Sequence, residues 1–205
     1  PFTTKSGRVS PYFINSGAAD DGAQLGQLGG FYADALMDRL NGEFDVLFGP
    51  AYKGIPLAIA TALALIEKHD KNVAVTFDRK EAKDHGEGGT IIGHSCEPGE
   101  RVVIIDDVLT AGTSVRQVCK LLREETECDV AAIMVGVDRQ EKGQGDRAAA
   151  VEMAEDLHLP VIAIATIDDV VAVLRTREID GKPVLTEEVL AAMDDYRARY
   201  GPRAG

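Results

Sequence analysis

The alternation of two kinds of apolar pattern is the feature that most restricts how this chain can fold. Short runs rich in β-branched residues alternate with longer stretches whose apolar residues recur every three or four positions. The first pattern predicts strands and the second predicts amphipathic helices. Expected strands cover 46–48, 73–77, 90–93, 102–107, 130–137 and 161–165, and expected helices cover 24–40, 55–68, 115–124, 147–157, 168–174 and 187–200. Strands separated by helices predict an α/β fold with a central, mainly parallel sheet flanked by helices.

The domain organisation follows from the same pattern. The 205 residues contain no internal repeat and no low-complexity linker, so we expect one α/β core over residues 22–205. Residues 1–21 precede the first expected helix and are predicted to form a small N-terminal hood. The sequence opens at Pro1 without a methionine, and we expect the hood to be incomplete at its start. Residues 78–89 are charged and end in Gly-Glu-Gly-Gly, which predicts an exposed, mobile loop within the core.

The charge balance restricts the class of partner. The formal net charge is −12, which argues against nucleic acid or an anionic membrane held by bulk charge. A local basic cluster can still bind a small anion within an acidic protein. The longest nearly apolar stretch, Ile55 to Ile66, is too short to span a bilayer, and no signal pattern is visible.

The cysteines and histidines show no ligand spacing. Cys96, Cys119 and Cys128 are an odd number without a C-x-x-C pair, which predicts reduced thiols in a cytoplasmic protein rather than disulfides. The four histidines have neither H-x-x-x-H nor Cys/His spacing, which argues against a dedicated zinc site.

The segment from Val102 to Ser114 carries the most specific chemistry. Four β-branched residues predict a buried strand, which ends in Asp106 and Asp107 and continues into small and hydroxylated residues and then a helix. Ligands of open parallel sheets bind beyond the carboxyl ends of the strands. A loop of small residues exposes backbone N–H groups to an anion, and the helix N-terminus adds positive partial charge. Two carboxylates beside such a cradle fit a ligand with hydroxyls or a divalent metal, such as a phosphorylated sugar carrying a diphosphate. The alternative is an acidic strand end followed by an ordinary helix cap.

The same segment, VVIIDDVLTAGTS, resembles the motif of type I phosphoribosyltransferases that binds 5-phosphoribosyl 1-diphosphate (PRPP). Residues 5–8, 10–15, 48–54 and 79–88 resemble motifs of the orotate-specific branch of that family, and the similarity spans about residues 2–175. The resemblance implies the type I phosphoribosyltransferase fold. It also implies a Mg²⁺-dependent pentosyltransferase that transfers the 5-phosphoribosyl group from PRPP to orotate, giving orotidine 5′-monophosphate and pyrophosphate in de novo pyrimidine biosynthesis.

The resemblance also implies a set of PRPP-binding residues. They are Tyr52, Lys53, Arg79, Lys80, Lys83, His85, Asp106, Asp107, Val108, Leu109, Thr110, Ala111, Gly112, Thr113 and Ser114. Within this set, residues 110–114 would hold the 5-phosphate, while Asp106 and Asp107 would meet the ribose hydroxyls and waters on Mg²⁺. The metal would arrive bound to PRPP, with no direct protein ligand. The catalytic residues implied are Arg79, Lys83, His85, Asp106 and Asp107.

Two further expectations come from the resemblance. One is a homodimer in which residues 78–89 close over the partner's site, with Arg79, Lys83 and His85 acting in trans and Lys80 serving its own site. The other is an orotate-binding set formed by Lys5, Tyr12, Phe13, Thr110 and Arg139. The family has Phe-Phe where this chain has Tyr12 and Phe13.

Plainer interpretations stay open for several of these residues. The charges of residues 78–89 nearly cancel, as they do in a solvated surface loop. Lys53 could be an ordinary exposed lysine at a helix start. The aromatic pair on the orotate side could pack an edge strand, and the two cations there could be surface charges.

Two other functions compete with this interpretation. A PRPP-sensing regulator that binds nucleic acid would need a basic face or a helix-turn-helix arm, and the sequence offers neither. A phosphoribosyltransferase for a purine base is a nearer competitor. Gly143 to Ala148 fits the dinucleotide pattern G-x-G-x-x-A, but polar residues 138–142 separate it from the preceding strand. Because the first glycine of that pattern belongs in the tight turn itself, we interpret the segment as a loop.

Overall fold

The central sheet is the framework of the molecule. The computed structural model describes residues 2–3, 7–79, 90–109 and 112–202. Six strands lie in the order β5-β4-β3-β6-β7-β8. They are β3 (Val46–Gly49), β4 (Ala74–Asp78), β5 (Ile91–Gly93), β6 (Arg101–Leu109), β7 (Asp129–Asp138) and β8 (Val161–Thr166). All are parallel to their neighbours except β5, which is antiparallel to β4. The mainly parallel sheet predicted from the sequence is therefore confirmed.

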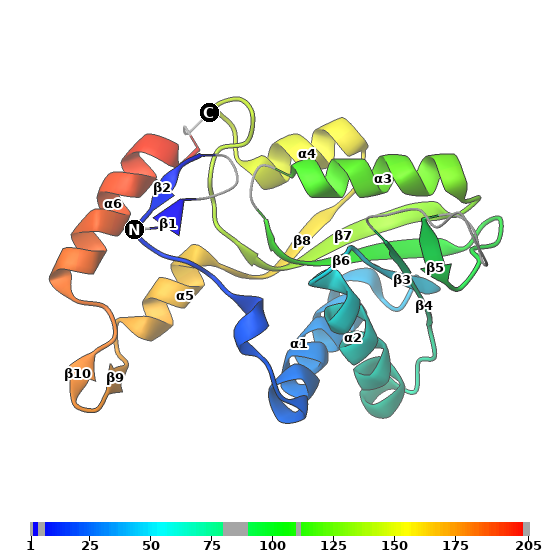
Figure 1. Cartoon of the computed structure of the whole chain (residues 1–205), viewed down its shortest axis with the longest axis horizontal. Coiled ribbons are helices and arrows are strands. Elements are labelled where there is room, and N and C mark those ends of the chain that lie inside the picture. Colours follow the sequence, from blue (N-terminus) through cyan, green and yellow to red (C-terminus); the bar gives the residue numbers. More distant parts are fainter. Residues whose placement is uncertain (1, 4–6, 80–89, 110–111, 203–205) are drawn as a thin grey trace.

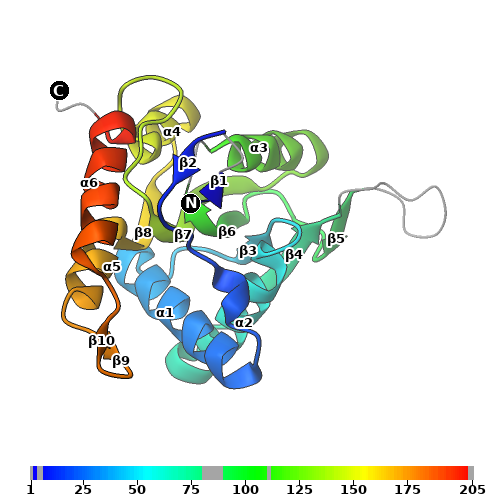
Figure 2. The same cartoon turned by 60° about the vertical axis from the view of Figure 1, so that its left-hand side comes forward.

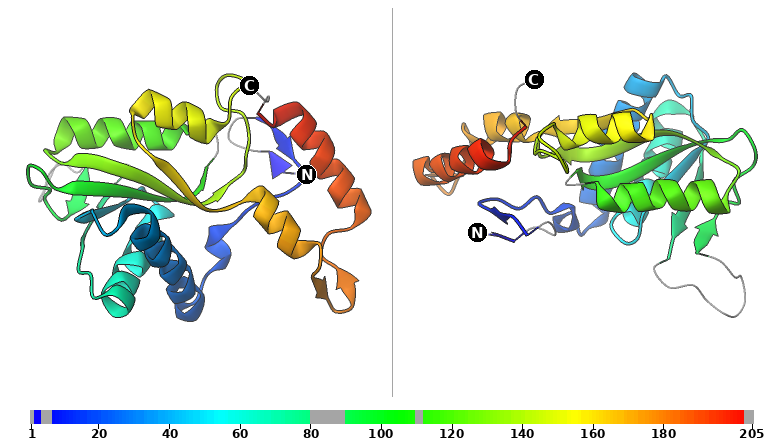
Figure 3. Two further views of the ribbon diagram at one scale, coloured as in Figure 1. Left: turned by 180° about the vertical axis from the view of Figure 1, so that it is seen from behind. Right: turned by 90° about the horizontal axis from the view of Figure 1, so that it is seen from above.

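Helices cover both faces of this sheet. Figure 1 shows α1 (Gly22–Leu40) and α2 (Gly54–His69) on one face, with α3 (Thr113–Glu125) and α4 (Ala149–Leu157) on the other. The view from behind in Figure 3 shows the same layers. Successive strand residues point to opposite faces, so Val103 and Ile105 pack into the α1/α2 core while Val102 and Ile104 pack into the α3/α4 core. This two-sided burial explains why β6 reads as a continuous apolar run.

The two ends of the chain meet beside the sheet. At the N-terminus, β1 (Phe2–Thr3) pairs with β2 (Val9–Ser10), and the 3₁₀ helix η1 (Ser16–Ala18) leads into α1. At the C-terminus, α5 (Ile167–Leu174) is followed by α6 (Glu187–Tyr200). Figure 2 shows the N-terminal hairpin between the sheet and α6.

A small hairpin between α5 and α6 was not predicted. Strand β9 (Glu178–Ile179) pairs with β10 (Lys182–Pro183) around a two-residue turn. That turn is Asp180–Gly181, where both residues have positive φ, 53° and 71°. An Asp-Gly pair is a strong signal for such a turn, but the strands are too short to show alternation.

The cysteines correct one expectation. A disulfide joins Cys96 to Cys128, with Cα atoms 5.7 Å apart, whereas Cys119 is a free, buried thiol. The prediction of reduced thiols is therefore wrong for this pair. The bonded residues are 32 positions apart and meet only because β6 lies beside β7, which no local spacing could reveal.

Within the described ranges, none of the helices combines the length and the apolar character needed to cross a membrane.

Candidate active site

The carboxyl ends of the parallel strands bring together most of the predicted site residues that the structure describes. Tyr52 and Lys53 follow β3, Arg79 follows β4, Arg139 follows β7, and Asp106 and Asp107 lie near the end of β6. Parallel strands end at the same edge of a sheet, so residues far apart in sequence become neighbours there. This edge is the candidate active site.

Asp107 accepts hydrogen bonds from several groups at this edge. Its Oδ2 atom lies 2.9 Å from Lys53 Nζ and accepts a hydrogen bond of 2.8 Å from the Ser16 hydroxyl. Its Oδ1 atom accepts the backbone N–H of Val108 at 2.9 Å. The Asp107 side chain is 14% exposed and that of Lys53 is 48% exposed. Lys53 is thus a cation at the rim of the site, held in place by a largely enclosed carboxylate.

Asp106 lies on the other face of the sheet. Strand alternation places it with Val102 and Ile104, opposite to Asp107. Its Oδ1 atom accepts the Asp107 backbone N–H at 2.9 Å, and its carbonyl oxygen accepts the Tyr32 hydroxyl at 2.8 Å. Burial raises the pKa of Tyr32, and the charges of both aspartates add to this effect, so its hydroxyl remains a neutral donor. The adjacent carboxylates therefore straddle the strand end, and a ligand meeting both must reach across it.

The turn from β3 to α2 is pressed closely against β6. The Ala51 N–H donates to Asp78 Oδ1 at 2.6 Å, and the Gly54 N–H donates to the Pro50 carbonyl at 2.9 Å. A Cβ atom at Gly54 would lie 2.7 Å from the Ile105 carbonyl oxygen, so only glycine fits there. This close approach carries Lys53 to Asp107 and leaves the Tyr52 side chain exposed.

The start of α3 lies just beyond the end of β6. Gly112 is the N-cap residue, with φ of +73°, and a Cβ atom there would lie 2.8 Å from Met153 Cε. The left-handed backbone therefore favours glycine, and a side chain here would also have to displace the end of Met153 on α4. The helix N-terminus that follows, with exposed Ser114, can offer backbone N–H groups to an anion.

Arg139 lies in a buried ionic cluster rather than at the surface. Its side chain is 3% exposed, and its Nε donates to Glu141 Oε1 at 2.7 Å. Its Nη2 donates to the Ser10 hydroxyl at 3.0 Å. Glu141 also accepts from the Tyr196 hydroxyl at 2.9 Å and pairs with Arg8 Nη1 at 2.9 Å. The charge of Arg139 is thus matched by a carboxylate that also contacts both ends of the chain.

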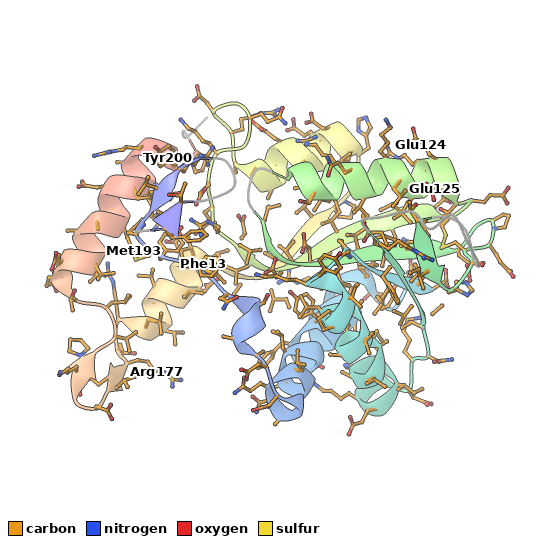
Figure 4. All side chains as sticks on the ribbon, in the orientation of Figure 1. Phe13, Glu124, Glu125, Arg177, Met193 and Tyr200 are labelled. Atoms are coloured by element: carbon orange, nitrogen blue, oxygen red, sulfur yellow. A yellow bond between two sulfur atoms is a disulfide. The ribbon has the colours of Figure 1, made fainter. Side chains whose placement is uncertain are left out.

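Two aromatic residues of the N-terminal segment face these cations. The Arg139 guanidinium lies 4.4 Å from the ring centroid of Tyr12, and Lys53 Nζ lies 5.9 Å from that of Phe13. Burial raises the pKa of Tyr12 to about 12, so its hydroxyl is protonated at neutral pH. That hydroxyl has no hydrogen-bond partner among the residues that the structure describes. Figure 4 labels Phe13 on the stretch between the N-terminal hairpin and α1.

The remaining predicted residues divide into two groups. The first lies outside the described residues: Lys5, Lys80, Lys83, His85, Thr110 and Ala111. The second group lies at the ends of β6 and β4 and consists of Val108, Leu109 and Arg79. The Leu109 side chain is buried in the α3/α4 core, so only its backbone can meet a ligand. The Arg79 N–H donates to the Thr90 carbonyl at 2.8 Å, which closes the base of segment 80–89.

Sequence reasoning missed four residues that hold this edge together: Ser16, Tyr32, Asp78 and Glu141. Glu141 stands two positions after Arg139, and that pairing of opposite charges was a usable signal. Ser16 and Tyr32 carry no local signal, because their contacts with residues 107 and 106 are made across the fold.

Comparison with known proteins finds relatives along nearly the full length of the chain. The chain matches the phosphoribosyl transferase domain family over residues 20–169. The orotate phosphoribosyltransferase of Yersinia enterocolitica is 48% identical over 200 residues, covering 98% of this chain and 89% of the relative. That of Lachnoclostridium phytofermentans is 45% identical over 203 residues, covering 99% of this chain and 90% of the relative. The solved orotate phosphoribosyltransferase of Francisella tularensis has a TM-score of 0.77 at 35% identity, covering 98% of this chain and 91% of that one. The fold expected from the sequence is confirmed.

Proposed function

The chain belongs to the orotate phosphoribosyltransferase family, and from this premise we propose how its residues divide the reaction. It is a pentosyltransferase of pyrimidine biosynthesis that transfers the 5-phosphoribosyl group of PRPP to orotate. Its substrates are therefore two anions, which an acidic protein can bind only where cations and backbone N–H groups are concentrated. The carboxyl edge of the sheet supplies such a place.

The PRPP site is proposed to extend across the ends of β3 and β6. Backbone N–H groups of residues 110–114 hold the 5-phosphate, supported by the glycine at position 112 and the N-terminus of α3. Asp106 and Asp107 accept hydrogen bonds from the ribose hydroxyls. The observation that supports this proposal is the Lys53–Asp107 pair at 2.9 Å, because it joins an exposed cation to a carboxylate at the strand ends, as a ligand with both a diphosphate and ribose hydroxyls requires.

The residues fit a magnesium ion that is carried by PRPP. The oxygens of Asp107 already contact Lys53, Ser16 and the Val108 N–H, so direct metal coordination would displace existing partners. We therefore propose that Asp106 and Asp107 hold metal-bound water rather than the ion. When bound, magnesium supplies charge neutralisation on the leaving pyrophosphate.

The orotate site is proposed between the N-terminal hood, residues 1–21, and the end of β7. Tyr12 and Phe13 form its apolar wall, while Lys5, Thr110 and Arg139 supply polar contacts. Nε and Nη2 of Arg139 are engaged by Glu141 and Ser10. A guanidinium carries five N–H donors, so others can meet the orotate carboxylate in a forked arrangement.

The catalytic unit is proposed to be a homodimer. Residues 78–89 would close over the partner's site, bringing Arg79, Lys83 and His85 in trans, while Lys80 serves its own site. Exposed apolar side chains support an interface on the outer side of α1 and α2: Phe31, Ile59, Leu63 and Ile66. The last three lie at helical spacing on one face of α2. A cytoplasmic location stays a prediction.

The test is the steady-state consumption of orotate with PRPP, followed in the ultraviolet, with adenine, hypoxanthine and guanine as competing bases. We expect turnover with orotate alone among these bases.

Lys83→Ala should lower kcat at least 100-fold with a much smaller change in the KM for PRPP, because Lys83 neutralises charge that develops on the leaving group. Lys120→Ala, an exposed lysine on α3, is the matched control and should leave both constants unchanged. An unchanged kcat in the Lys83 variant would defeat its assignment.

A further inference from the structure

A second cluster of reactive side chains lies at the opposite edge of the sheet. Parallel pairing sets Arg101 beside Asp129 at the start of β6 and β7, so the preceding residues, Glu100 and Cys128, are neighbours. The Asp129 N–H donates to the Glu100 carbonyl at 2.9 Å. A turn closed by the bond from the Glu100 N–H to the Glu97 carbonyl, 3.1 Å, brings Cys96 back to the same place.

The three side chains converge closely enough to share one ion. One ligand atom from each of Cys96, Glu100 and Cys128 lies within 4.8 Å of the other two. Cys128 is 8% exposed, while Cys96 and Glu100 are partly open to solvent, which leaves a path of entry. Such a convergence of two sulfurs and a carboxylate is a set of ligands that zinc accepts.

Hydrogen bonds orient the Glu100 carboxylate. Glu100 Oε2 accepts the Glu97 N–H at 2.7 Å and lies 2.8 Å from His94 Nε2. Metal-binding carboxylates are commonly held by outer hydrogen bonds of this kind. His94 Nε2 also lies 3.1 Å from Glu100 Oε1, so the turn and the histidine hold the carboxylate in place, and binding of a cation would replace one of these contacts.

We propose that Cys96, Cys128 and Glu100, once the disulfide is reduced, bind a thiophilic divalent cation such as Zn²⁺. A dithiol reductant opens the disulfide by exchange, giving two cysteine thiols and the oxidised dithiol. Binding then forms two Zn–S bonds and one Zn–O bond and releases the two thiol protons. Tetrahedral zinc places sulfurs about 3.7 Å apart, a separation that only the opened pair can reach, and leaves a fourth position for water. Disulfide and metal are thus mutually exclusive ways to connect the β5–β6 segment to β7.

The experiment uses the full chain, reduced with a dithiol, freed of it under anaerobic conditions and titrated with Co²⁺ as a coloured probe. We expect one equivalent to bind, with a sulfur-to-cobalt charge-transfer band that Zn²⁺ abolishes by displacement and Mg²⁺ does not. Cys96→Ser should remove the band. Glu100→Gln should weaken binding about tenfold or more.

Two controls separate this site from other thiols and from the active site. The oxidised wild-type chain should bind no Co²⁺ with this band, a comparison that needs no variant to fold. Cys119→Ser, which removes a buried free thiol that is not one of the three converging ligands, should keep the band. The proposal is overturned if the reduced chain shows no charge-transfer band, or if the oxidised chain or Cys96→Ser binds equally well. None of these readouts depends on orotate turnover.

Discussion

Single residues at the site are constrained by hydrogen bonding more than by charge alone. Asp107 and Glu141 each accept hydrogen bonds from several groups. Lys53 is one donor to Asp107 and Arg139 is one donor to Glu141, so each carboxylate fixes the position of one cation. The end of a buried strand and the acidic pair predicted Asp106 and Asp107, whereas Lys53 and Arg139 were implied only by the family resemblance. The sequence did not predict Ser16 as a partner of Asp107, because a serine 91 positions away in sequence becomes a neighbour only after folding.

Tyr12 offers a test at this scale. Its hydroxyl is buried and lacks a partner within the described residues, a situation that costs free energy. Tyr12→Phe should therefore leave the free energy of unfolding unchanged or raise it by up to about 1 kcal/mol, as measured by urea denaturation.

Tyr196→Phe is the matched control, because the Tyr196 hydroxyl donates to buried Glu141. Its loss should lower the free energy of unfolding by about 1.5–3 kcal/mol, the range for a hydrogen bond to a charged group. If Tyr12→Phe lowers the free energy of unfolding to the same extent, the Tyr12 hydroxyl has a hydrogen-bond partner in the folded wild-type protein, which would contradict this prediction.

At the level of elements, the core helices were predicted from apolar residues at three- and four-residue spacing, and the core strands from short runs of β-branched residues. The first residues of the helices were predicted less accurately than the helices themselves. Helix α1 starts at Gly22 rather than at residue 24, because the Asp21 carboxylate accepts the Gln24 N–H at 2.8 Å and caps it. The start of α3 depends on Gly112, whose left-handed backbone joins the end of β6 to the helix.

Gly112→Ala should disturb that junction in two ways. The left-handed backbone costs a residue with a Cβ atom about 1–2 kcal/mol, and the methyl group would press against Met153. We expect a lower melting temperature and, because the N-terminus of α3 shifts, a higher KM for PRPP.

Gly99→Ala separates these two effects. Gly99 has φ of +86° but nothing within 4 Å of its Cβ position, and it lies near the other edge of the sheet. This variant should show the loss of stability without the change in KM. An unchanged KM in Gly112→Ala as well would contradict the role of α3 in holding the 5-phosphate.

At the scale of the whole molecule, the contacts between the chain ends could not be foreseen. Arg8 reaches Glu141 across 133 positions, and the rings of Tyr12 and Tyr196 meet edge to face with centroids 5.9 Å apart. Figure 4 shows Tyr200 on α6 next to the N-terminal hairpin. A periodic sequence pattern cannot predict such contacts, because each depends on how the central sheet positions two segments that lie far apart in the sequence.

The proposed exchange of residues 78–89 between subunits has a sharp test. Lys83→Ala removes the leaving-group cation from that segment, and Asp107→Asn removes the carboxylate of the core. Each homodimer should be nearly inactive. If the segment acts in trans, a hybrid dimer keeps one site with both residues intact, so an equal mixture should recover about a quarter of wild-type activity.

The mixture is prepared by dissociating and reassociating equal amounts of the two variants and is assayed by orotate consumption. Reassociated Lys83→Ala alone is the control and should stay inactive. If the segment acts in cis, every hybrid site lacks one residue, and a mixture as inactive as its components would contradict the exchange.

The carboxylate at position 141 has a consequence that reaches beyond its immediate contacts. It accepts from an arginine near the amino terminus, from an arginine beside the proposed orotate pocket and from a tyrosine on the last helix. Trimming that last helix would strip one donor from a buried anion and loosen its hold on the other two. Removal of α6 would then weaken the preference for orotate over other bases. Chains shortened at the C-terminus should therefore lose substrate specificity before they lose their folded structure.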